Sequence, residues 1–162
     1  MKTRRLSTFL RYWVPILVWL GLIFIGSSDL MSAEHTSRII GPMLRWFRPT
    51  ISLAGIAKVQ FIVRKAAHVS EYAVLSALIF RAFVRTVWVG RLMLSAAVVL
   101  LLCAAYAASD EFHQSFVPSR TASMRDVLID IGGVILGMMI YGSFAQRKRE
   151  RVSKVSPGEF TA

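Results

Sequence analysis

The stretch that decides the fold is LMLSAAVVLLLCAAYAAS, residues 92–109, an apolar run without a single charged side chain. Its length is close to the roughly 20 apolar residues that a helix needs to cross the hydrocarbon of a bilayer. The rest of the chain shares this character, since 55% of its 162 residues are hydrophobic, only 18% are charged and the mean hydropathy is +0.54. A soluble domain carries about a quarter charged residues. The composition therefore predicts an integral membrane protein.

Further apolar segments on both sides of this run predict an all-α membrane protein with a four-transmembrane-helix bundle. The expected spans are about 12–28, 64–84, 91–110 and 125–145, within one membrane domain that covers 12–145. A basic N-terminus, 1–11, precedes the domain, and a basic tail, 146–162, follows it and is expected to be disordered. The first span resembles a signal peptide, but its long apolar run and weak cleavage site favour a retained helix.

The distribution of charge along the chain predicts contact with a membrane rather than with nucleic acid. The net charge is +11, but the Lys and Arg residues bracket the apolar blocks and form no separate basic domain. Basic residues beside spans orient a protein and contact anionic lipid headgroups. Of the 20 Lys and Arg residues, twelve lie on the side of the two termini and eight on the other. We therefore expect a multi-pass protein of the bacterial inner membrane with both termini cytoplasmic and no nucleic-acid partner.

The segment between the first two spans has two interpretations. Apolar residues recur there at helical spacing opposite Arg38 and Arg45: Ile39, Ile40, Met43, Leu44 and Phe47. This pattern is typical of an interfacial helix on the outer leaflet, with Pro42 and Pro49 limiting its length. The alternative is an ordinary loop whose apolar residues pack on the spans.

Ionisable residues occupy one half of the second and fourth spans, and polar residues follow the end of the third. Lys65, His68 and Tyr72 share one helix face with Glu71 at its edge, and Asp110 and Gln114 share another. In the fourth span a third face carries Asp126 and Asp130, followed by Gly133 and Gly137, a spacing that lets helices approach closely.

With the expected topology these groups lie at one depth, near the outer surface. Charges inside a bilayer usually face a bundle interior or a water-filled cavity. We therefore predict one outward-facing polar pocket, capped by the loop 116–123. Its binding residues are Lys65, His68, Glu71, Tyr72, Asp110, Glu111, Gln114, Arg120, Asp126 and Asp130.

Two motifs resemble those of the VanZ-like membrane proteins of bacteria. They are RKAAHVSEYAVLSALIFRAF, 64–83, and SDEFHQSFVPSRTASMRDVLIDIGGVILG, 109–137. The chain departs from the family pattern at Asp29, Ser119 and Asp130, where the family has Gln, Gly and Asn. The family is named after a member associated with low-level resistance to the glycopeptide antibiotic teicoplanin, so the resemblance implies a link to that antibiotic. It implies no particular reaction.

Three functions remain open. In the first, Arg120, Lys65 and Arg64 bind the phosphate or carboxylate of an anionic envelope lipid, a lipid-linked cell-wall precursor or a glycopeptide antibiotic. In the second, the protein is an intramembrane enzyme acting on a lipid headgroup, with His68 as acid or base and Glu71 or Asp110 as its partner. In the third, the polar residues only hold the helices together in a structural or assembly protein.

No cofactor and no metal are expected from the sequence. A metal site would have to use His68, Glu71, Asp110 and His113, which lack a recognisable ligand spacing. Cys103 is the only cysteine, so no disulfide can form within the chain. The oligomeric state stays open.

Overall fold

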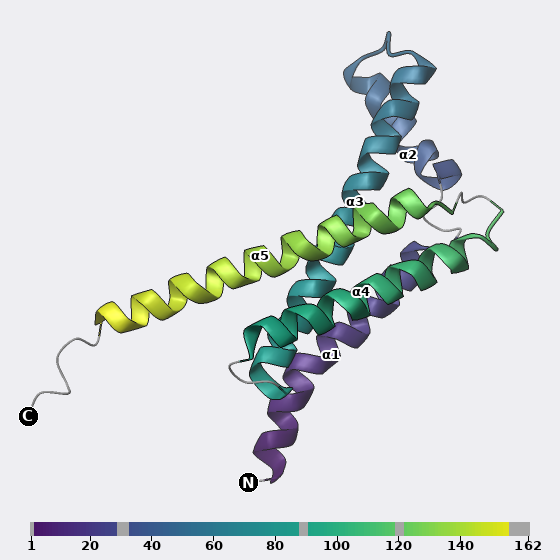
Figure 1. Ribbon diagram of the computed structural model, residues 1–162. Coiled ribbons are helices and arrows are strands. Elements are labelled where there is room, and N and C mark those ends of the chain that lie inside the picture. The colour runs from purple at the N-terminus through teal and green to yellow at the C-terminus, as the bar shows by residue number, and fades with distance from the viewer. Residues whose placement is uncertain (1, 29–32, 88–90, 119–121, 156–162) are drawn as a thin grey trace, which may run out of the picture.

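The computed structural model describes residues 2–28, 33–87, 91–118 and 122–155, with side chains for 6–28, 38–87, 91–118 and 122–147. Regular structure in these ranges is entirely helical (Figure 1). The elements are α1 (Lys2–Gly26), α2 (Ala33–Phe47), α3 (Leu53–Ala82) with a π-helical continuation η2 (Phe83–Val87), α4 (Leu92–Gln114) and α5 (Met124–Val155).

Four of these helices are long and apolar enough to cross a membrane. The segments are Leu6–Gly26, Leu53–Val87, Leu92–Gln114 and Met124–Arg147. Their surfaces carry many exposed apolar side chains, such as Leu17, Leu101 and Leu128, each 67–69% exposed in the isolated chain. Lipid covers such side chains at no cost in hydrophobic free energy. The prediction of an all-α, four-span bundle is confirmed, and the chain is a multi-pass membrane protein.

All four long helices extend beyond the predicted spans, α1 back to Lys2 and α4 on to Gln114. The other two extensions are those of α3 and α5. The first, α3, begins at Leu53, where the Ser52 Oγ caps it by accepting a hydrogen bond from the Gly55 N–H at 3.1 Å. Its 30 residues measure about 45 Å at 1.5 Å per residue, more than the roughly 30 Å of hydrocarbon. The second, α5, runs on to Val155, so residues 146–155 are helical where a disordered tail was expected. Lys, Arg and Glu are good helix formers, and charge alone does not end a helix.

The segment between the first two spans is a helix and not a loop. Here α2 continues through Pro42, which was expected to limit it, and ends at Phe47, ahead of Pro49. It contacts α3, and its apolar side chains Ile39, Met43 and Trp46 are exposed. Its place on the outer leaflet remains a prediction.

The closest packing in the bundle joins α3 to α5. A Cβ at Gly133 would contact the backbone of Val69, and a Cβ at Gly137 would collide with the Ala73 carbonyl oxygen. The Ser76 Oγ also donates a hydrogen bond to the Val134 carbonyl oxygen at 2.9 Å. Because residue numbers rise together along both helices, α3 and α5 run in the same general direction where they cross, and their polar residues meet there.

Hydrogen bonds donated by aromatic side chains join α1 to α3 and α4 to α1. The Trp19 Nε1–H of α1 donates to the Glu71 carbonyl oxygen of α3 at 2.9 Å, and the Tyr106 hydroxyl of α4 donates to the Leu20 carbonyl oxygen of α1 at 2.9 Å. Fully buried Tyr72, Leu75 and Val99 form the middle of the core. The result is a bundle whose polar residues gather where α1 and α4 end and α5 begins.

Candidate functional site

The candidate site lies between α3, the end of α4 and the start of α5. Seven of the predicted binding residues are buried there, none with more than 5% of its surface exposed: His68, Tyr72, Asp110, Glu111, Gln114, Asp126 and Asp130. Buried polar atoms in proteins nearly always have hydrogen-bond partners. The polar atoms that have partners, and those that lack them, therefore indicate what the site can bind.

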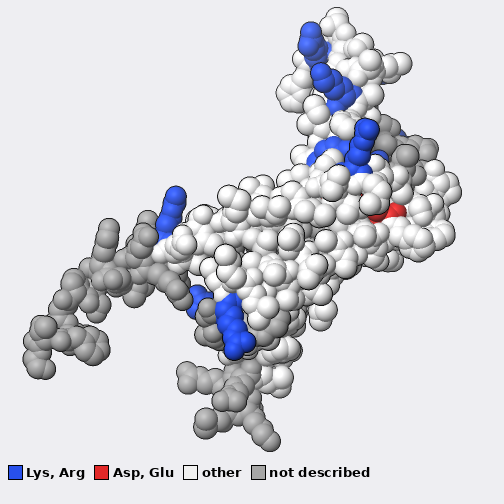
Figure 2. All heavy atoms as spheres, viewed as in Figure 1, with Lys and Arg blue, Asp and Glu red and all other residues white. Residues whose placement is uncertain are grey.

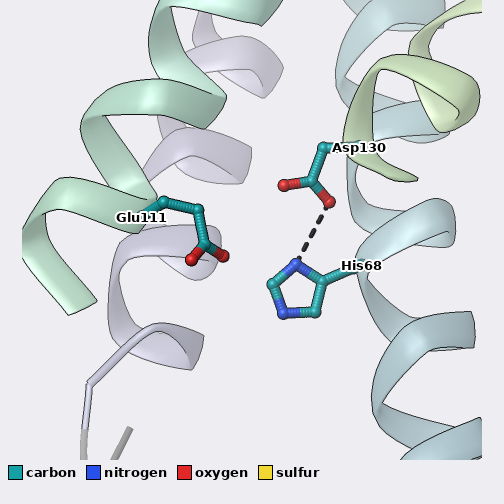
Figure 3. A group of neighbouring side chains, drawn as sticks. All are labelled: His68, Glu111 and Asp130. Carbon is teal, nitrogen blue, oxygen red and sulfur yellow. Dashed lines mark hydrogen bonds and ion pairs between the residues drawn. The ribbon is translucent and has the colours of Figure 1, made fainter. Parts of the chain in front are cut away.

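His68, Glu111 and Asp130, one residue from each of three helices, form what we call the acid–histidine cluster. The His68 Nδ1 lies 3.1 Å from the Asp130 Oδ1, and one donor atom from each residue lies within 4.8 Å of the others (Figure 3). The Glu111 Oε2 accepts a hydrogen bond from the Ser123 N–H at 2.8 Å, which ties the start of α5 to α4. The Glu111 Oε1 and the Asp130 Oδ2 are buried and have no hydrogen-bond partner.

Arg64 and Lys65, neighbours on α3, form a second group that we call the basic pair. The Lys65 Nζ makes an ion pair with the Asp126 Oδ1, and the Arg64 Nη2 lies 3.9 Å from the Asp126 Oδ2. One carboxylate thus faces two cations. The Arg64 Nε and Nη2 are buried and have no hydrogen-bond partner.

Gln114 and Asp110 form a third group at the end of α4. The Gln114 Nε2 donates to the Asp110 Oδ2 at 3.2 Å and to the Ser27 Oγ of α1 at 3.4 Å. The Gln114 Oε1 and the Tyr72 hydroxyl are buried without a partner. This group joins α4 to α1.

Charge is distributed unevenly over the molecule. Lys and Arg side chains stand out over α2 and the first half of α3, whereas little of the acidic side chains reaches the surface on this face (Figure 2). The acids Asp110, Glu111, Asp126 and Asp130 are buried at the same end of the bundle. On this face the basic side chains thus lie at the surface, whereas these four acids lie in the interior.

Several predicted site residues lie elsewhere. Glu71, which with Asp110 was predicted as an orienting partner of His68, places its Oε1 3.6 Å from the position of a Cβ at Gly26. The His113 ring packs on the Phe24 ring, with centroids 4.7 Å apart. Of the four residues considered for a metal, only His68 belongs to the acid–histidine cluster. Arg120, Asp29 and Ser119 lie outside the described residues.

The helix face of the fourth span indicated Asp130, but its direct contact with His68 could not be predicted from helical spacing. Glu111 was placed in the pocket without a role. Its position beside His68 and Asp130 depends on how α4 is rotated against the other two helices, which a single sequence does not reveal.

Fold and site define a class of protein: an all-helical, four-span membrane protein with a buried polar site near one end of its bundle. The chain belongs to the VanZ/LLP1 family, whose profile matches residues 12–145. No curated protein and no solved structure matches the chain.

Proposed function

We propose that this protein binds the anionic headgroup of an envelope lipid or lipid-linked cell-wall precursor at the basic pair, on the outer side of the cell membrane. The observation that carries the proposal is Arg64, whose buried Nε and Nη2 make no hydrogen bond, with the Asp126 carboxylate 3.9 Å from Nη2 as an ion-pair partner only. Leaving such charged donors unpaired costs more than leaving neutral ones.

The chemistry of the basic pair suits a phosphate or pyrophosphate. A guanidinium group presents paired donors that match phosphate oxygens, and an ammonium group adds a point charge. Asp126 neutralises only one of the two cations, so the pair retains a positive charge for a ligand. The side chains of Arg64 and Lys65 are 24% and 21% exposed, which leaves a route for a headgroup from the membrane surface.

Altered sensitivity to teicoplanin-type antibiotics would follow from binding of a cell-wall precursor. This part of the proposal rests on the family membership and on the expected outward orientation. It predicts that cells expressing Arg64→Gln lose any protection that the wild-type chain gives.

The direct test is lipid mass spectrometry of the full chain purified in detergent. Wild type and the control Lys58→Gln, which removes an exposed cation from the same helix, should retain one anionic headgroup class. Arg64→Gln and Lys65→Gln should retain at least about tenfold less, since a charge-assisted hydrogen bond contributes roughly 1.5–3 kcal/mol. Equal retention of the same lipid by Arg64→Gln and wild type would overturn the proposal.

One observation favours a second function, an intramembrane enzyme acting on a lipid headgroup. The Asp130 carboxylate contacts His68 as an orienting carboxylate contacts a catalytic base, with Glu111 beside them. Turnover of a phospholipid in vesicles, lost in His68→Gln and kept in the control His113→Gln, would establish it. If His68→Gln keeps full activity, acid–base chemistry at this residue is excluded.

A further inference from the structure

We propose that the acid–histidine cluster is a binding site for one divalent transition-metal ion, with His68, Glu111 and Asp130 as its ligands. The proposal goes beyond headgroup binding and uses different residues. Its first support is the set of donors, because a nitrogen ligand and two carboxylates suit Zn²⁺ or Mn²⁺ better than they suit Ca²⁺ or Mg²⁺.

The second support is the unpaired atoms inside the cluster. The Glu111 Oε1 and Asp130 Oδ2 are acceptors without donors, on side chains of residues that are at least 95% buried. A buried carboxylate oxygen without a partner is costly. A cation bound between the three residues would supply that partner, which neither helix packing nor the hydrogen bond to Ser123 does.

The geometry is close to that of a three-residue site. Zinc ligands lie about 2.0–2.2 Å from the ion, so ligands in tetrahedral positions are about 3.4 Å apart. The donor atoms here lie within 4.8 Å of one another. Side-chain rotations that move each donor by about 1 Å would complete the site, and a fourth position would remain open for water or a ligand oxygen.

The surroundings hold the three residues in place. The close packing of α3 on α5 at Gly133 and Gly137 fixes His68 opposite Asp130, and the Ser123 N–H orients the Glu111 carboxylate. The basic pair makes its ion pairs with Asp126 and not with Glu111 or Asp130. The charge of the two carboxylates therefore lacks a Lys or Arg partner within the described part of the chain.

The test uses the full chain in detergent, stripped with EDTA and dialysed against ZnCl₂ or MnCl₂. Metal content per chain is measured by mass spectrometry, affinity by titration, and the melting temperature with and without metal. Wild type should bind about one ion and melt higher with it, because a ligand that binds only the folded state stabilises that state. His68→Gln, Glu111→Gln and Asp130→Asn should each weaken binding at least about 100-fold, since loss of even an outer partner of a ligand weakens binding 10–100-fold.

Matched controls separate the site from general effects on charge. His113→Gln removes a histidine from the same end of α4, and Lys58→Gln removes an exposed cation from α3, yet neither side chain belongs to the cluster. Both should bind metal like wild type, as should Arg64→Gln, so headgroup and metal binding can fail separately. Absence of metal binding in wild type, or equal binding by wild type and Glu111→Gln, would overturn the proposal. If one of the three ligand variants does not fold, the metal content of wild type and the binding by the other two variants still test the proposal.

Discussion

Gly137→Ala should destabilise the protein by forcing α3 and α5 apart. The added Cβ would collide with the Ala73 carbonyl oxygen and with the Ser76 Oγ, and a backbone carbonyl cannot rotate away. Overpacking of this kind costs about 1–3 kcal/mol. Separation of the helices would also weaken the hydrogen bond from Ser76 to the Val134 carbonyl oxygen, adding about 0.6–1 kcal/mol. The expected loss is about 2–4 kcal/mol, a change of roughly 30- to 1,000-fold in the unfolding constant.

The assay is reversible unfolding in mixed micelles with increasing SDS, followed by far-ultraviolet circular dichroism. Gly132→Ala is the matched control, because it adds the same methyl group to the same helix where no atom lies within 4 Å. Its free energy of unfolding should stay within about 1 kcal/mol of wild type, and any change should be stabilising. If Gly137→Ala unfolds at the same SDS fraction as Gly132→Ala, close packing at Gly137 does not hold the site together.

Three further perturbations test other parts of the site. A double-mutant cycle on Lys65→Met and Asp126→Leu should give a coupling free energy of about 1–3 kcal/mol by the same SDS titration, and a value near zero would contradict a formed ion pair. In a Cys103→Ala background, Pro118→Cys should react with a membrane-impermeant maleimide added outside intact cells, whereas reaction only after lysis would reverse the proposed orientation. Apolar replacement of the whole acid–histidine cluster should leave the free energy of unfolding unchanged or raised while abolishing metal binding, and a loss of several kcal/mol would show that the cluster mainly holds the helices together.

Hydropathy and helical periodicity were sufficient to predict the fold and to indicate most of the polar residues that the structure buries together. Apolar runs are long in all four spans, and the spacing of Asp126, Asp130, Gly133 and Gly137 correctly predicts a single face of α5 that packs closely on a neighbour. The tail was predicted less well. A charged segment without an apolar stripe is typical of disorder, yet α5 continues as far as Val155 because the residues there are good helix formers.

Partner choice inside the site could not be predicted, because it depends on the rotation of each helix about its own axis. Glu71 and His68 are less than one turn apart on α3, yet Glu71 lies toward α1 while His68 meets Asp130 of α5. On α4, neighbouring Asp110 and Glu111 are both buried, yet Asp110 accepts a hydrogen bond from Gln114 of its own helix whereas Glu111 accepts one from the Ser123 N–H just ahead of α5. Rotation of a helix about its axis by the angle between two neighbouring residues would exchange these roles. Helical spacing in one sequence does not specify that rotation.

A purely structural role explains the buried groups poorly. The Gly-lined contact and the Ser76 hydrogen bond already join α3 to α5 without any charge. Each additional buried carboxylate costs about 2.5–3.5 kcal/mol on insertion scales, and apolar residues of similar volume often stabilise a protein as well as a buried ion pair does.

In the basic pair and the acid–histidine cluster, the buried atoms that make no hydrogen bond also differ in type. Those of the basic pair are donors on Arg64, and those of the acid–histidine cluster are acceptors on Glu111 and Asp130. Arg64 and His68 are one helical turn apart on α3, about 6 Å along the axis. An anion at the first position and a cation at the second would satisfy both sets, whereas added helix contacts would satisfy neither. A phosphate headgroup bound together with a divalent ion has this arrangement of charge, and for that reason the two proposed sites are best tested on the same protein, one variant at a time.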